Sequence, residues 1–159
     1  MWSNNVSLDI HAPPEKIFAY LIDFSRHAEW SSNVKEIKLV RGKLGEVGAK
    51  YEALENIPRP MTTYARIIEV RPPPLRQSQS GALIGWEATD YRVFRTQWRL
   101  RIQPRYDVDA VVSHVSMRVT FYPLNFFANL ILYLFRVPRV EHENRASLMK
   151  IKEIVERQT

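Results

Sequence analysis

A chain of 159 residues with 45% hydrophobic and 25% charged side chains has the composition of one globular domain, residues 1–159, which excludes a fibrous or disordered protein. The absence of cysteine excludes disulfides, thiolate metal sites and a cysteine nucleophile, and is compatible with the cytoplasmic location that we expect. The net charge is +6 at pH 7, but no Lys/Arg-rich run of the nucleic-acid type occurs, so we expect no nucleic-acid partner.

The first thirty residues predict a strand followed by two short helices. Residues 6–10 alternate apolar and polar side chains, as a half-buried strand does. Pro14 suits the first turn of a helix, which residues 17–24 continue with an apolar face. A second short helix ends near Trp30. The first residues show no basic region followed by an apolar run, so we expect no signal peptide.

Six further strands are predicted from alternation, β-branched content and turn residues. They cover residues 34–40, 49–54, 62–71, 75–83, 91–102 and 111–121. Gly42, Gly45 and Gly48 indicate a hairpin connection between the first two of these strands, and they do not follow the dinucleotide-binding pattern. The strand at 75–83 is unusually polar, which suits a hydrated interior.

The two last strands alternate most clearly. On residues 91–102, the even-numbered side chains are predicted to face inward, and the odd-numbered arginines to face solvent. On residues 111–121, the odd-numbered side chains are predicted to face inward. One face of the sheet is therefore expected to be buried and the other wet.

A long helix is predicted at residues 124–157, apolar on almost every side up to residue 135 and amphipathic afterwards. Its predicted inward stripe consists of Phe127, Leu130, Ile131, Leu134, Glu141, Asn144, Leu148, Ile151 and Val155. At about 1.5 Å per residue, residues 124–137 span about 21 Å, short of the roughly 30 Å hydrocarbon core. We therefore predict a buried core helix, kinked or divided at Pro138. A helix lying in a membrane interface, flanked by Arg136 and Arg139, is the alternative.

Strand, two helices, six strands in hairpin succession and a terminal helix together predict an α+β fold. Short connections imply antiparallel pairing. A twisted sheet with one apolar face would curl that face around the terminal helix.

The sequence resembles the polyketide cyclase/dehydrase family of the START-like (SRPBCC) superfamily. The opening motif of that family is similar to APPEKIF at residues 12–18 and LIDFSRHAEW at 21–30, and later parts are similar to residues 45–51, 69–75 and 145–153. The resemblance covers essentially the whole chain. It implies a helix-grip fold, in which a seven-stranded antiparallel sheet wraps the C-terminal helix around an internal cavity. Family members bind lipids, quinones, polyketides and other apolar molecules, and some are aromatase/cyclases.

No catalytic constellation is found in the sequence. A serine-centred elbow, a phosphate loop and a zinc-binding His-Glu-x-x-His motif are all missing, and His142 has no second ligand at helical spacing. We therefore assign no catalytic residue and expect no metal and no cofactor.

The remaining candidate is an apolar pocket with a few polar groups, the usual composition of a small-molecule site. Its predicted lining from sheet and helix is Phe94, Trp98, Met117, Phe121, Phe127, Leu130, Ile131 and Leu134. Hydrogen bonds are assigned to Tyr51, Tyr64, Gln77 and Gln79. If Arg66 faces inward, its guanidinium would bind a ligand carboxylate or carbonyl. The alternative is that these side chains fill a solid core.

Three functions stay open at this point. The missing catalytic groups favour a carrier or sensor of an apolar small molecule, such as a lipid, quinone or polyketide-like compound. An aromatase/cyclase or dehydrase would use the same cavity, with Tyr64, Arg66 or a carboxylate as acid or base. A peripheral contact with an anionic membrane is the third. The sequence carries no signature of oligomeric state.

Overall fold

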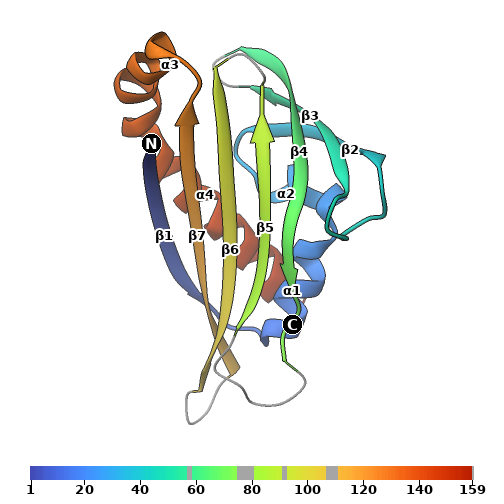
Figure 1. Cartoon of the computed structure of the whole chain (residues 1–159). Coiled ribbons are helices and arrows are strands. Elements are labelled where there is room, and N and C mark those ends of the chain that lie inside the picture. The colour runs from blue at the N-terminus through green and yellow to red at the C-terminus, as the bar shows by residue number, and fades with distance from the viewer. Residues whose placement is uncertain (57–58, 75–80, 91–92, 107–110, 159) are drawn as a thin grey trace.

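The computed structural model describes residues 1–56, 59–74, 81–90, 93–106 and 111–158. Its elements are β1 (Trp2–Ile10), α1 (Pro14–Ile22), the 3₁₀ turn η1 (Phe24–Arg26), α2 (His27–Trp30), β2 (Val34–Arg41), β3 (Lys50–Asn56), β4 (Pro60–Arg71), β5 (Ala82–Thr89), β6 (Phe94–Tyr106), β7 (Val111–Pro123), α3 (Phe126–Ile131), the π-helical turn η2 (Leu132–Arg136) and α4 (Val137–Arg157). Figure 1 shows them as one curved sheet with the helices on its concave side.

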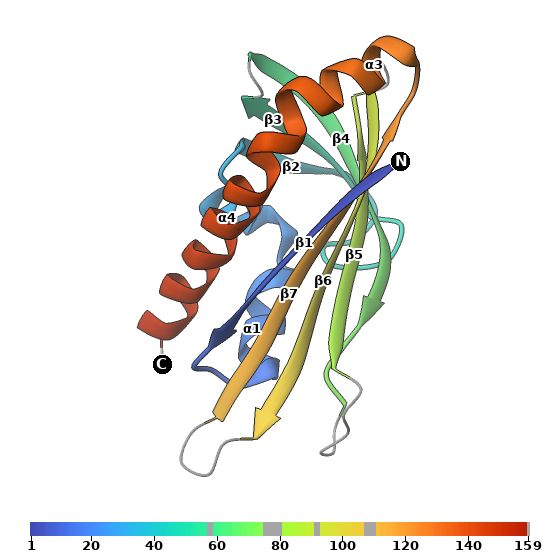
Figure 2. The same cartoon turned by 90° about the vertical axis from the view of Figure 1, so that its left-hand side faces the viewer.

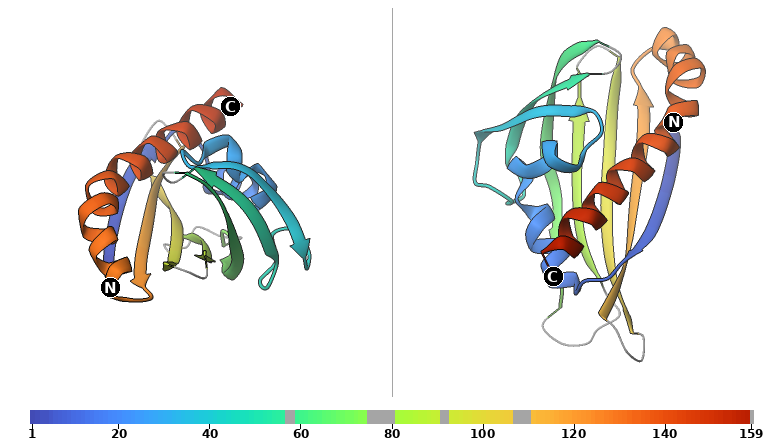
Figure 3. Two further views of the ribbon diagram at one scale, coloured as in Figure 1. Left: turned by 90° about the horizontal axis from the view of Figure 1, so that it is seen from above. Right: turned by 180° about the vertical axis from the view of Figure 1, so that it is seen from behind.

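The seven strands form one antiparallel sheet in the order β1-β7-β6-β5-β4-β3-β2. β1 and β2 follow each other in the chain but lie at opposite edges of the sheet, and α1, η1 and α2 bridge the distance between them. Seen from above, the sheet is strongly curved, and α4 lies across its concave side (Figure 3). This is the predicted α+β helix-grip architecture.

The inner face of the sheet and one stripe of α4 form the main core. The buried residues of α4 include Leu148, Ile151 and Val155, at the helical spacing that the sequence predicts. They pack with buried side chains such as Ile17 of α1 and Met117 of β7. The alternation predicted for the last strands is also confirmed, since the arginines of β6 are exposed.

The glycine-rich connection between β2 and β3 is the predicted hairpin. Gly42, Gly45 and Gly48 all have positive φ angles, of 89°, 74° and 91°. A side chain at position 45 is also excluded sterically, because an added Cβ would lie 2.9 Å from the carbonyl oxygen of Ile22. The glycine spacing therefore serves the turn and its packing on α1.

The strand predicted at residues 75–83 is wrong in its position. β5 covers Ala82–Thr89, and residues 75–80 lie outside the described part of the chain. Gly85 lies within β5, where an added Cβ would be 3.3 Å from the Cβ of Glu69. Alternate residues Ala82, Ile84 and Trp86 are buried, and their spacing is the signal that would have placed the strand.

The prediction of a buried first half for the terminal helix is also wrong. We call residues 124–135 the apolar segment, and its exposed side chains are Leu124, Phe126, Phe127, Leu130, Ile131, Tyr133, Leu134 and Phe135. Only Ala128 and Leu132 of this segment are buried. Figure 2 shows why: α3 stands at the far end of the helical rod, near the end of β7, where no strand lies over its outer side.

The helix changes pitch where the sequence predicts a division. η2 widens the helix just before Pro138, which has no amide hydrogen to donate and whose ring crowds the carbonyl four residues earlier. Beyond this turn, α4 follows the predicted stripe at Asn144, Leu148, Ile151 and Val155. Glu141 was wrongly placed in that stripe, since its side chain is exposed and Val140 takes the buried position. Among the described residues, no helix combines the length and the apolar character needed to cross a bilayer.

Candidate functional site

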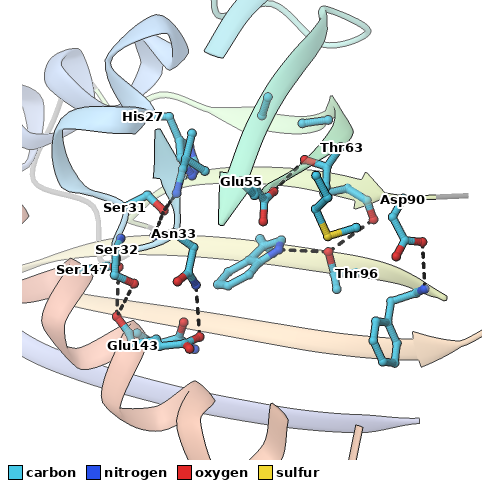
Figure 4. Close-up of a pocket in the computed structure, with 18 of the residues that line it drawn as sticks. His27, Ser31, Ser32, Asn33, Glu55, Thr63, Asp90, Thr96, Glu143 and Ser147 are labelled. Carbon is cyan, nitrogen blue, oxygen red and sulfur yellow. Dashed lines mark hydrogen bonds between the residues drawn. The ribbon is translucent and has the colours of Figure 1, made fainter. Parts of the chain in front are cut away.

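A cavity of about 800 Å³ lies between the concave face of the sheet and the N-terminal half of α4. We call it the central cavity. Its wall is drawn from β2 to β7, from α2 with the loop that follows it, and from η2 and α4. Such a volume is in the range of small-molecule sites, roughly 300–1,000 Å³. Figure 4 shows the polar groups of the wall, contributed by both the sheet and the helices.

Small side chains on neighbouring strands create this volume. The inward positions at this end of β3, β4 and β5 carry Ala53, Thr63, Ala65 and Ala88, and all four line the cavity. A strand of the same pattern carrying leucine or isoleucine would fill the space. The interior is therefore a packed core around Leu148 and Ile151, and a hollow nearer the apolar segment.

Aromatic rings form the floor of the central cavity. The indoles of Trp86 and Trp98 are parallel, with an interplanar angle of 2° and ring centroids 5.7 Å apart. The Trp98 Nε1–H donates a hydrogen bond of 3.1 Å to the hydroxyl of Thr96, so its polar atom is satisfied within the wall. The stacked rings form a rigid apolar part of the wall.

His27 is buried within the same aromatic group. Its ring centroid is 4.1 Å from that of Trp30, 4.6 Å from that of Phe24 and 5.4 Å from that of Trp86. Burial lowers the pKa of the His27 imidazole to about 3, so the ring is neutral at physiological pH. Its Nδ1 is enclosed and has no hydrogen-bond partner among the described residues, and an unpaired buried group of this kind costs about 1–3 kcal/mol.

Glu55 brings a carboxyl group to the wall of β3. Its Oε1 accepts a hydrogen bond of 2.7 Å from the Thr63 hydroxyl. Burial raises the pKa of the Glu55 carboxyl, and the Thr63 hydrogen bond and the charge of Arg136 oppose that rise. A partly buried carboxyl group with a raised pKa is suited to proton transfer.

An ion pair between η2 and α4 is hydrogen-bonded to the loop after α2. Arg136 Nη1 lies 3.1 Å from Glu143 Oε2, and the two side chains are only 12% and 20% exposed. Asn33 Nδ2 donates a hydrogen bond of 3.1 Å to the same carboxylate oxygen. The Arg136 guanidinium also lies 5.8 Å from the ring centroid of Phe121. Arg139, one turn from Arg136, lines the cavity, is exposed and forms no ion pair with a described residue.

This arrangement can bind an apolar molecule and offer it a few polar contacts. The carboxyl group of Glu55 and the neutral imidazole of His27 are two groups of the wall that could transfer protons. Among the described residues, no cluster of three or more histidine and acidic side chains has the geometry of a metal site.

The structure brings together five of the thirteen predicted pocket residues. The central cavity is lined by Phe94, Trp98, Met117, Phe121 and Ile131. Gln77 and Gln79 lie outside the described residues. Whether the five bind a ligand stays a prediction.

Three predicted polar residues do not face the cavity. Tyr51 is fully buried in the core, where its hydroxyl accepts a hydrogen bond of 3.2 Å from the Gly45 amide. Tyr64 and Arg66 lie on the opposite face of β4, and the Arg66 guanidinium pairs with Glu87 at the surface. The inward orientation suggested for Arg66 is therefore wrong, because the small residues alternating with it, such as Ala65, face inward instead.

Three predicted helix residues also point away from the sheet. Phe127, Leu130 and Leu134 are exposed, and Ala128 and Leu132 take the inward positions. The prediction assumed one regular helix through residues 124–157. The π-helical turn η2 shifts which side chains of the preceding residues face the sheet.

Sequence reasoning missed the polar groups His27, Glu55 and Arg136. Their residue types alone mark none of them. For Glu55, alternation along β3 from the buried Tyr51 and Ala53 gives the inward parity, so that position could have been found. Trp86 was missed with the true position of β5.

The family model described as "Polyketide cyclase / dehydrase and lipid transport" matches residues 1–156. Comparison with curated proteins gives no significant match. Among solved structures, the Zhui aromatase/cyclase from Streptomyces sp. R1128 has a TM-score of 0.72 at 13% identity, over 99% of this chain and 94% of that chain. The di-domain ARO/CYC BexL from the BE-7585A biosynthetic pathway has a TM-score of 0.70 at 12% identity, over 98% of this chain and 47% of that chain. The hypothetical protein jhp0584 from Helicobacter pylori has a TM-score of 0.68 at 11% identity, over 96% and 86% of the two chains. At these identities the likeness establishes the shared fold.

Proposed function

The chain belongs to the polyketide cyclase/dehydrase and lipid transport family, and on that basis we propose that it binds a hydrophobic, ring-containing small molecule in the central cavity, as a carrier or sensor. The observation that carries the proposal is a hollow of about 800 Å³ floored by the parallel indoles of Trp86 and Trp98. A ring-containing ligand of the quinone or polyketide type would pack against these aromatic side chains. We expect the protein to act in the cytoplasm.

The polar groups of the wall support a ligand with a few oxygen atoms. The carboxyl group of Glu55, which lines the cavity and accepts a hydrogen bond from Thr63, would accept a hydrogen bond from a ligand hydroxyl when ionised and donate one to a carbonyl when protonated. Arg139, exposed at the cavity, would take a negatively charged or carbonyl end.

The ligand is tested first by native mass spectrometry of protein purified without detergent, and then by titration with a panel of lipids, quinones and polycyclic aromatic compounds. Trp30, Trp86 and Trp98 all line the cavity, so a bound aromatic ligand is expected to quench the intrinsic fluorescence. A ligand-free mass together with no quenching across the panel contradicts the proposal.

A matched pair of variants on β4 assigns the binding to the cavity. Ala65→Leu adds a side chain into the hollow, whereas Thr62→Leu adds the same side chain on the exposed side of the strand. We expect Ala65→Leu to weaken binding at least tenfold and Thr62→Leu to leave the affinity unchanged. Equal affinities in the two variants would place the ligand elsewhere.

A second candidate is an aromatase/cyclase or dehydrase that uses the same cavity. The observation that favours it is that one apolar cavity is lined by both the Glu55 carboxyl group, whose pKa is raised, and the neutral His27 imidazole. Two of the similar structures are those of aromatase/cyclases. The test is turnover of a linear poly-β-ketone substrate by the wild type, Glu55→Gln and His27→Gln. Turnover that both variants lose, with binding retained, supports an enzyme, whereas binding without turnover in the wild type supports the carrier.

A further inference from the structure

The apolar segment, residues 124–135, carries half of the large hydrophobic side chains that are exposed among the described residues. Phe126 and Phe127 are 77% and 74% exposed. The helix begins properly, since the Asn125 side chain accepts a hydrogen bond of 2.8 Å from the Ala128 amide. A well-formed helix that shows phenylalanine and leucine to solvent on most of its circumference marks an interaction surface.

The shape of this surface favours a fluid partner over a folded one. Adjacent exposed positions such as Phe126 and Phe127, and again Tyr133, Leu134 and Phe135, point in widely different directions around the helix axis. A second protein covers one stripe of a helix, whereas the interface of a bilayer surrounds the helix on every side except the one that rests on the protein.

The charges near the segment match an anionic membrane. No acidic residue occurs between Leu124 and Arg139, and the chain carries a net charge of +6. Arg139 follows the apolar segment by one turn, is exposed and has no ion-pair partner among the described residues. An exposed arginine one turn after an apolar segment places its charge at the level of lipid phosphates when the rings are inserted.

The segment also borders the central cavity. Ile131 and Phe135 are exposed and line the cavity at the same time, and Arg139 lines it too. We propose that residues 124–135 insert into the interface of an anionic phospholipid membrane and that this docking turns the cavity mouth toward the lipid. The docking stands by itself, whereas passage of an apolar ligand between membrane and cavity rests on the proposed function.

The test is co-sedimentation with vesicles of phosphatidylcholine alone and of equimolar phosphatidylcholine and phosphatidylglycerol. We expect the wild type to bind the anionic vesicles, and the double variant Phe126→Ser/Phe127→Ser to bind them at least tenfold more weakly. Arg139→Gln should lose affinity for the anionic vesicles only. Met149→Ser, which removes an exposed apolar side chain from α4, is the control and should bind as the wild type does. These side chains are exposed, so all variants are expected to fold, and thermal unfolding checks this.

The cysteine-free chain allows a second readout. An environment-sensitive dye on Phe127→Cys should shift to the blue on vesicles, whereas the same dye on Met149→Cys should not. Failure of the wild type to bind either vesicle, or equal binding by the Phe126→Ser/Phe127→Ser variant, overturns the proposal. So does a dimer that this variant dissociates without any vesicle binding, because the surface would then join two copies of the chain. Neither phenylalanine lines the cavity, so ligand binding measured on the same variant tests the proposed function separately.

Discussion

His27 should make the stability of the protein strongly dependent on pH. Burial lowers the pKa of its imidazole from about 6.5 to about 3. Because the folded state resists the proton that the unfolded chain accepts, the stabilising effect is complete above pH 6.5 and is lost as the pH falls toward 3. For these two values, the free energy of unfolding falls by about 2 kcal/mol between pH 8 and pH 5.

The measurement is urea unfolding of the ligand-free protein at pH 8 and pH 5, compared with His27→Phe. Phenylalanine keeps an aromatic ring beside Phe24, Trp30 and Trp86 but cannot bind a proton. The difference between wild type and variant isolates His27, because the other titrating groups are common to both. His27→Leu gives the same comparison if the phenylalanine variant folds poorly.

The result that refutes this reasoning is the same loss of stability with pH in both proteins. It would mean that the His27 ring is protonated in the folded state. A histidine ring resonance that remains neutral at pH 5 in the wild-type NMR spectrum would support the mechanism directly.

Three further predictions concern packing and charge. Leu148→Ala should lower the free energy of unfolding by about 2–5 kcal/mol because it empties a fully buried site, whereas Met149→Ala, exposed on the next residue, should change it by less than about 0.5 kcal/mol, as measured by urea denaturation. Arg136→Met should lower the free energy of unfolding by about 1–3 kcal/mol, because it leaves the partly buried Glu143 carboxylate without its ion-pair partner. Adding Glu143→Gln should recover much of this loss. Equal stabilities of the wild type and Arg136→Met in urea denaturation would show that the ion pair contributes nothing. Glu55→Gln should stabilise the protein at pH 7, because a raised pKa means that ionisation above about pH 4.5 weakens the fold, and the gain should shrink on acidification toward that pH.

The sequence predicted the fold well because its pattern is redundant. Alternation on β6 and β7, the glycine turn before β3 and the amphipathic α4 all required the same sheet and helix. Each error has a local cause. The strand predicted at residues 75–83 overlaps β5 only at its last two residues, because the alternation of Ala82, Ile84 and Trp86 was not used.

The candidate site was less predictable because the cavity depends on small side chains that leave space unfilled. A hollow arises where Ala53, Ala65 and Ala88 meet across three strands, and only the register between those strands brings them together. His27 lies in a four-residue helix, whose periodicity is too short to read. Parity can assign a side chain to the inner face of a sheet, but whether the inner face is filled there is decided by its neighbours.

The π-helical turn η2 makes the orientation of the side chains of α3 independent of the buried side of α4. In a regular α-helix each residue advances by about 100°, so the side gripped by the sheet fixes the direction of every other side chain along the rod. η2 introduces a step in that sequence of directions between α3 and α4. Deleting one residue there would turn α3 by about 100° while leaving Leu148 and Ile151 in place. The exposed aromatic side chains of α3 would rotate about the helix axis, and different side chains of the apolar segment would face solvent while α4 kept its packing on the sheet. A one-residue insertion or deletion at η2 can therefore change the surface that α3 exposes without changing the core.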